Sequence, residues 1–129
     1  MRELIKTLKV LSDESRLRVL NLLLERECCV CEVMQVMGIS QSKASRILSA
    51  LYDAGLLKLR RESRWALYSL DKDGMKGYMN DILNGITRAL DSYPLASQDR
   101  EKLKKAERVG PGCANKLCKR KLAIEASQS

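Results

Sequence analysis

The turn around Gly38 constrains the fold of this chain more than any other feature, because it separates two short stretches with helical spacing. Before it, Val33, Val36 and Met37 form an apolar stripe that ends at the glycine, and glycine suits the left-handed conformation of a helix end. After it, Ser40 can cap the next helix. The sequence therefore predicts a helix, a turn of three to four residues and a second helix.

The second helix is expected to have an apolar inner face and a short, basic outer face. Its apolar residues recur at i, i+3, i+4 and i+7, and they are Ala44, Ile47, Leu48 and Leu51. The outer face includes Gln41, Ser42, Lys43, Ser45 and Arg46. In a helix-turn-helix the second helix enters the major groove, so these five residues are predicted to contact double-stranded DNA, at base edges or phosphates.

A β-hairpin is predicted directly after this helix. The stretch LLKLRRESRWALYSL alternates well enough for two strands, near residues 56–61 and 65–70, with a charged turn around Glu62 and Ser63. Arg60, Arg61 and Arg64 on this hairpin are predicted to hold the flanking DNA backbone or to reach into the minor groove. A single lysine or arginine is as often a solvated side chain, but residues 39–64 hold six Lys/Arg against two Asp/Glu, a balance of +4.

Apolar residues at helical spacing also flank this unit, near residues 4–11, 17–24 and 74–90. The last stripe is wider than a small domain needs for itself, which predicts a dimer surface on that helix. The predicted fold is mainly α with a small β-hairpin. Residues 1–93 form the DNA-binding and dimerisation domain, and residues 94–129 form a basic, cysteine-containing extension broken at Gly110-Pro111-Gly112.

The net charge of +8 predicts a polyanionic partner, with nucleic acid first and an anionic membrane surface second. No run of about 18 apolar residues and no signal-peptide core is present, so we expect a cytoplasmic protein without a membrane partner. Cytoplasmic thiols stay reduced. The five cysteines are therefore interpreted as ligands or sensors and not as a disulfide framework.

Three of these cysteines, Cys28, Cys29 and Cys31, lie within four positions in the stretch RECCVCEV. On a regular helix Cys28 and Cys31 share a face, whereas Cys29 points about 200° away from Cys31, so the three thiols converge only if the first turn unwinds. The helix N-terminus favours thiolates. The nearby carboxylates of Glu25, Glu27 and Glu32 oppose them, and the sequence leaves open which effect dominates.

The order of ECCVCEV, SQSKASRILSALYDAGLL and RRESRWALYSL resembles the ArsR/SmtB family of winged-helix repressors, over about residues 5–90. The resemblance implies a winged helix-turn-helix homodimer, with terminal helices at the interface, that senses arsenic or metals. Two positions depart from the family pattern: Ile47 replaces a histidine of the recognition helix, and Ser63 replaces the glycine of the wing turn. The chain has no histidine, so the family's His/Asp zinc site on the last helix is not expected.

Cys29-Val30-Cys31 resembles the CVC motif of the arsenic- and cadmium-responsive branch. Trivalent arsenic and antimony favour three sulfur ligands. The family's third cysteine is Met34 here, so Cys28, or else Cys113 or Cys118 from the extension, is the candidate third ligand.

The predicted function is a transcriptional repressor that binds operator DNA when apo and is released by arsenite, As(III), or antimonite bound to cysteine thiolates, without an organic cofactor. The alternative is a repressor of the same fold that responds to thiol oxidation or to a soft metal such as Cd, Pb or Zn. A thiol oxidoreductase using residues 28–31 as CxxC lacks the expected βαβ context. No enzyme is predicted, because no histidine-based catalytic arrangement and no phosphate-binding glycine loop is present.

Overall fold

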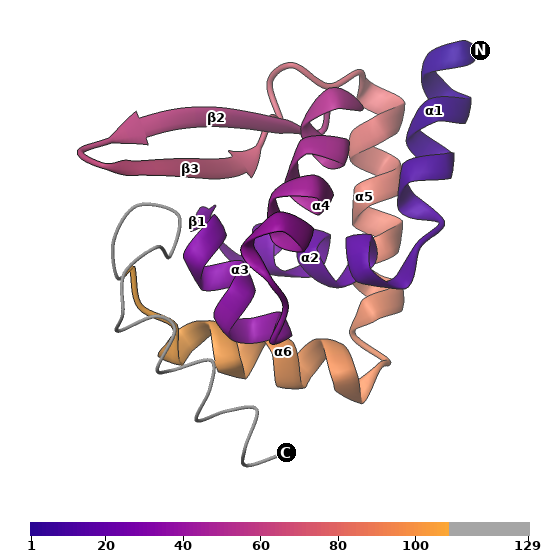
Figure 1. Cartoon of the computed structure of the whole chain (residues 1–129). Helices are drawn as coiled ribbons and strands as arrows, with labels where there is room; N and C mark the ends of the chain where they lie inside the picture. The colour runs from indigo at the N-terminus through magenta and orange to yellow at the C-terminus, as the bar shows by residue number, and fades with distance from the viewer. Residues whose placement is uncertain (109–129) are drawn as a thin grey trace.

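The computed structural model describes residues 1–108, which fold into helices packed around one core with a small sheet at the edge. The helices are α1 (Arg2–Leu11), α2 (Glu14–Glu25), α3 (Val30–Met37), α4 (Gln41–Asp53), α5 (Gly77–Leu90) and α6 (Pro94–Lys105); the strands are β1 (Cys28–Cys29), β2 (Leu57–Glu62) and β3 (Trp65–Leu70). In Figure 1 the β2–β3 hairpin projects from the helical body, and α6 crosses beneath α2 and α3.

The helix-turn-helix forms at the predicted residues. Gly38 ends α3 with a φ of 63°, and its N–H donates a 2.8 Å hydrogen bond to the carbonyl of Met34. Ser40 caps α4, because its Oγ accepts the backbone N–H of Lys43 at 3.1 Å. Both ends of the turn are therefore fixed by local chemistry that the sequence displays.

The inner face of α4 is buried as its spacing predicts. Ala44, Leu48 and Leu51 are fully buried, and Ile47 is 7% exposed. They pack into the core with the apolar residues of α2, α3 and the sheet. The outer face of α4 therefore points toward solvent.

The sheet contains the predicted hairpin and one strand that was not predicted. Its order is β1-β3-β2, with both pairs antiparallel. Cys28 and Cys29 form β1, opposite Tyr68 and Leu67, so α3 begins only at Val30. The three cysteines therefore do not share one regular helix, because the backbone of β3 offers Cys28 and Cys29 ladder hydrogen bonds.

The turn between β2 and β3 contains a strained residue. Ser63 has a φ of 57°, and it is the one non-glycine residue with positive φ in the described part of the chain. A two-residue hairpin turn requires positive φ at one or both central positions, which glycine satisfies at least cost. Ser63 therefore keeps the turn geometry of a glycine.

Helix α6 is part of the folded body. Pro94 stands at its first turn, and the helix packs against α2 and α3. Residues 94–108 of the predicted C-terminal extension thus contact the core, and the division after residue 93 stays a prediction. Cys113 and Cys118 lie outside the described residues.

Apolar side chains of α1 and α5 remain on the surface. Met79 and Leu83 of α5 are buried, whereas Tyr78 is 41% exposed, and Ile5 and Leu8 of α1 are 44% and 48% exposed. Within residues 1–108, no helix is both long and apolar enough to cross a membrane. The architecture is mainly α with a β-hairpin, which confirms the predicted winged helix-turn-helix.

Candidate DNA interface and thiol site

The predicted contact residues of α4 lie on its solvent side. Gln41, Ser42, Lys43 and Arg46 are exposed, and Ser45 is half-buried. They follow the N-cap directly, so the first two turns of α4 present polar and basic side chains outward. In helix-turn-helix proteins, this end of the second helix is the part that contacts base edges.

A concavity of about 350 Å³ lies between the start of α2 and this face of α4, lined by Asp13, Ser15, Arg16, Lys43, Arg46 and Ile47. Arg16 was not among the sequence-predicted residues. It is separated from α4 by more than twenty positions, and only the packing of α2 against α4 brings it close to Lys43 and Arg46. The basic surface is therefore wider than the helix alone.

The three arginines of the wing, which is the β2–β3 hairpin, have different surroundings. Arg61 and Arg64 are exposed and form no ion pair with any residue in the range 1–108. Arg60 donates from Nε and Nη2 to the carboxylate of Glu27, at 2.8 and 2.7 Å, and from Nη2 to Glu62 at 2.9 Å. The Arg60 hydrogen bonds hold the pKa of Glu27 below its usual value.

The predicted cysteines lie together at the junction of β1 and α3. Cys28, Cys29 and Cys31 are 0%, 3% and 1% exposed. Consecutive strand residues point to opposite faces, which separates the sulfur of Cys28 from that of Cys29. Among residues 1–108, no three Cys, Asp or Glu side chains are arranged to hold a metal ion. The structure therefore brings the cysteines close without assembling a three-ligand site.

Cys29 is the N-cap residue of α3. Its backbone N–H donates a 3.0 Å hydrogen bond to Glu32 Oε1, and its thiol lies against the backbone N–H of Glu32. Cys31 follows in the first turn of α3. The two cysteines of the CVC motif are thus arranged around the N-terminus of this helix.

The thiols of Cys28 and Cys29 are free, and burial keeps them protonated. Burial raises the pKa of Cys28 to about 12, with a further increase from the Glu32 carboxylate. Burial also raises the pKa of Cys29 to about 11, against a decrease from the backbone N–H of Glu32. The sequence left open whether the helix N-terminus or the nearby carboxylates dominate the pKa of these thiols. In the structure, loss of solvation raises the pKa more than the helix N-terminus lowers it.

Glu32 is a buried carboxylate, 2% exposed, whose charge is compensated from two sides. Arg26, at the end of α2, pairs with Oε2, and Arg108 donates from Nε to Oε1 at 3.0 Å. Arg108 also joins the carbonyl of Glu27 at 3.5 Å. Sequence reasoning missed this function of Arg108, which lies 76 positions from Glu32.

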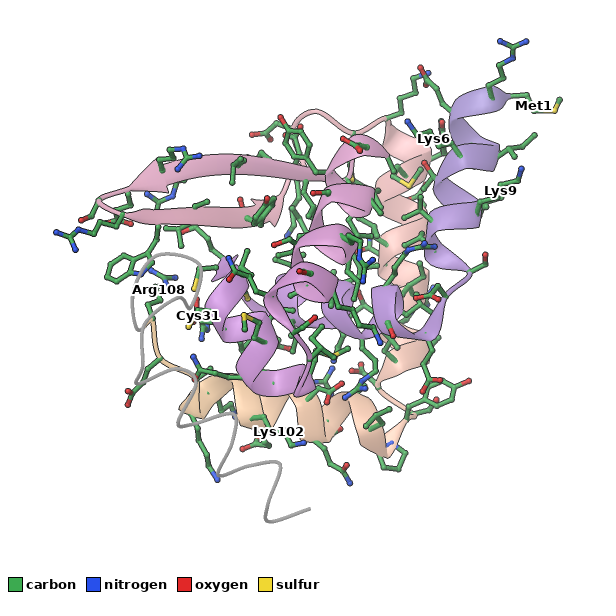
Figure 2. All side chains as sticks on the ribbon, viewed as in Figure 1. Met1, Lys6, Lys9, Cys31, Lys102 and Arg108 are labelled. Atoms are coloured by element: carbon green, nitrogen blue, oxygen red, sulfur yellow. The ribbon has the colours of Figure 1, made fainter. Side chains whose placement is uncertain are left out.

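Gln35 connects α3 with the chain that follows α6. Its Nε2 lies 3.2 Å from Cys31 Sγ and donates to the carbonyl of Glu107 at 2.6 Å, while its Oε1 accepts the N–H of Glu107 at 3.1 Å. Figure 2 shows Cys31 and Arg108 close to one another. The segment around Glu107 is therefore held beside the cysteine-bearing turn.

Comparison with known proteins finds relatives among bacterial regulators of arsenic and cadmium resistance. A profile of bacterial regulatory proteins of the arsR family matches residues 13–58. The arsenic resistance transcriptional regulator ArsR1 of Pseudomonas putida is 36% identical over 93 residues, covering 69% of this chain and 72% of the relative. A cadmium resistance transcriptional regulatory protein CadC homolog of Staphylococcus aureus is 39% identical over 72 residues, covering 55% of this chain and 60% of the relative.

Among solved structures, a winged helix-turn-helix DNA-binding domain of Mycobacterium bovis has a TM-score of 0.60 at 24% identity, covering 72% of this chain and 82% of that domain. That domain is homodimeric and is described as a possible ArsR-family transcriptional regulator. At this identity the likeness establishes the fold.

Proposed function

Because this chain belongs to the ArsR family of bacterial transcriptional regulators, we propose that it is a repressor that holds operator DNA when apo and is released by trivalent arsenic bound to cysteine thiolates. The single observation that carries the proposal is the place of the CVC motif. Cys29 caps α3, the first helix of the DNA-reading pair, and Cys31 lies in its first turn. A ligand that rearranges this turn acts directly on the support of α4.

Operator binding by a homodimer is supported by the two exposed surfaces. Lys43, Arg46 and the wing arginines Arg61 and Arg64 supply positive charge on one set of elements. Ile5, Leu8 and Tyr78 leave apolar area on α1 and α5. A two-fold pair of recognition helices reads successive major grooves, which requires a dimer, and the apolar area on α1 and α5 offers it an interface.

The arsenic-binding assignment rests on the donor chemistry. Soft thiolates suit As(III), and burial of the three sulfurs excludes water from the bonds they form. Arsenite, As(OH)₃, carries its own hydroxyl groups, so each neutral thiol can lose its proton as an As–S bond replaces an As–OH bond and water leaves. The raised pKa values of Cys28 and Cys29 therefore do not prevent binding at neutral pH.

The third sulfur is proposed to come from Cys28 or from the extension. The carbonyl of Glu107 lies 3.8 Å from Cys31 Sγ. Cys113 is six positions further along, and six extended residues span at most about 20 Å, so the same subunit can supply it. Cys118 is within reach by the same argument.

A soft-metal response is the second candidate. Thiolates bind cadmium and lead as well as arsenic, and one relative is named for cadmium resistance. Oxidation is a further alternative: burial disfavours the thiolate, the form that reacts with peroxide, at Cys28 and Cys29, whereas Cys31 is disulfide-bonded in the structure.

The test is fluorescence anisotropy with a labelled operator duplex, selected from a random pool by the apo protein, at fixed salt. We expect arsenite to weaken binding by at least tenfold, which requires a coupling free energy of about 1.4 kcal/mol. Release by cadmium and not by arsenite supports the second candidate. Unchanged operator affinity with arsenite, antimonite, cadmium and lead would contradict the inducer assignment.

A further inference from the structure

We infer that the Glu27–Arg60 ion pair couples the cysteine-bearing residues 28–31 to the β2–β3 hairpin, the wing. Arg60 then serves as a positioning residue instead of a DNA contact. The inference rests on the proposed function, because it specifies how the inducer site controls DNA binding. It replaces the sequence-based expectation for Arg60 with a role that depends on a partner 33 positions away.

The sheet gives the geometric basis. Leu67 of β3 pairs with Cys29 on one side and with Arg60 on the other, so the three residues form one row across the sheet. Directly opposed residues share a face. From β2 the side chain of Arg60 crosses β3 and reaches Glu27, which directly precedes β1. The ion pair thus connects the two outer strands of the sheet.

The geometry of the pair favours a mechanical role. Two parallel N–H···O bonds, at 2.7 and 2.8 Å, fix both the distance and the orientation of the guanidinium. Glu62 accepts a further bond from the same Nη2. With two carboxylates beside it, Arg60 attracts a phosphate less than Arg61 or Arg64 does, since these two have no ion pair in residues 1–108.

Inducer binding would act on this connection through β1. The strand is only two residues long and carries two of the thiols, so sulfurs that converge on one ion pull Cys28 or Cys29 out of register with β3. Glu27 moves with them, and its two bonds to Arg60 break. The wing then loses its position relative to α4.

The experiment compares Glu27→Gln, Arg60→Gln and the double variant with wild type, using the selected operator duplex with and without arsenite. Arsenite loading is followed separately by the near-UV absorbance of arsenic–thiolate bonds. Glu62→Gln is the matched control, because it removes the other carboxylate of Arg60 and leaves the contact with the cysteine segment intact.

We expect the operator affinity of apo Glu27→Gln to fall by about threefold, the scale of a two-point surface pair, and that of the loaded protein to stay unchanged. Removing a negative charge near DNA should by itself strengthen binding, so a decrease cannot be a charge effect. Arg60→Gln and the double variant should match Glu27→Gln, while Glu62→Gln keeps the wild-type ratio.

Two results would overturn the inference while the proposed function stands. The first is a wild-type ratio in Glu27→Gln. The second is an equal loss of affinity in both states for Arg60→Gln alone, with a smaller salt dependence, which identifies a phosphate contact. If wild type itself is not released by arsenite, the proposed function fails, and the coupling fails with it.

Discussion

Asp99 on α6 accepts two hydrogen bonds from the guanidinium of Arg18 on α2, at 2.8 and 2.9 Å, and its side chain is completely buried. Few apolar side chains of α6 reach the core, among them Ala96 and Leu103. The ion pair therefore positions this helix against α2, together with the 3.0 Å hydrogen bond from Asn21 Nδ2 to the carbonyl of Ala96.

Arg18→Met should lower the free energy of unfolding by about 3 kcal/mol, because it leaves the carboxylate of Asp99 buried without a partner. Urea denaturation followed by far-UV circular dichroism measures the change. Lys102→Met on the same helix, at an exposed position, is the control and should stay within about 0.5 kcal/mol of wild type. Similar stability of both variants would show that α6 docks without this pair.

Cys29→Ser and Cys31→Ser should each abolish arsenite-induced release and leave apo operator binding within about threefold of wild type. Serine is a good N-cap residue, so α3 keeps its start when Cys29 is replaced. Operator anisotropy with and without arsenite gives the result. The same substitution at Cys28, Cys113 and Cys118 identifies the third ligand, and a full response in all five variants would exclude a cysteine site.

The stability of wild type relative to Cys28→Ala should decrease as the pH rises above 9. An unfolded thiol loses its proton near pH 9.0, whereas the buried thiol keeps it until about pH 12. Between these values the unfolded state binds fewer protons than the folded state, so alkaline pH favours unfolding of wild type. Urea midpoints of both proteins at pH 8, 9 and 10 measure this difference, and a constant difference would contradict the assigned burial effect.

Ser63→Gly should raise the free energy of unfolding by about 0.5 kcal/mol. A non-glycine residue at positive φ costs about 1 kcal/mol, and the greater freedom of glycine in the unfolded chain offsets part of the gain. Thermal denaturation measures it. Ser69→Gly, within β3, should instead destabilise the protein, and a loss of stability at both positions would show that the turn does not strain Ser63.

Lys43→Gln should lower operator affinity by a similar factor on every DNA sequence. Loss of one phosphate contact reduces the slope of log K against log salt by about 0.9. Anisotropy titrations at four salt concentrations give that slope, with Lys102→Gln as the control. Arg46→Gln should in addition alter the preferred DNA sequence if Arg46 reads a guanine edge. A change in the salt slope alone would identify Arg46 as a second phosphate contact.

Much of the DNA-reading unit follows from local patterns. Gly38 and Ser40 fix the two helix ends, and the hairpin lies within one residue of its predicted strands. These features depend on interactions between residues a few positions apart, which a sequence displays directly.

The missed features depend on partners that are distant in sequence. No local pattern near Cys28 predicts a strand, because its pairing partner in the sheet is the distant Tyr68. Glu32 was counted only as a charge that opposes thiolates, since its compensation by Arg108 exists only after α6 has packed. Arg60 could be recognised as basic but not as the partner of Glu27.

The place of β1 in the sheet also limits how the sensor can be redesigned. A chimera that imports residues 27–32 from a regulator with another inducer preference would change the ligands together with Glu27 and Glu32, which pair with Arg60 and Arg108. If the Glu27–Arg60 coupling inferred above holds, such a graft would bind the new inducer with a smaller change in operator affinity. Transplanting specificity into this scaffold therefore requires co-selection of four positions beyond the thiols themselves: 27, 32, 60 and 108.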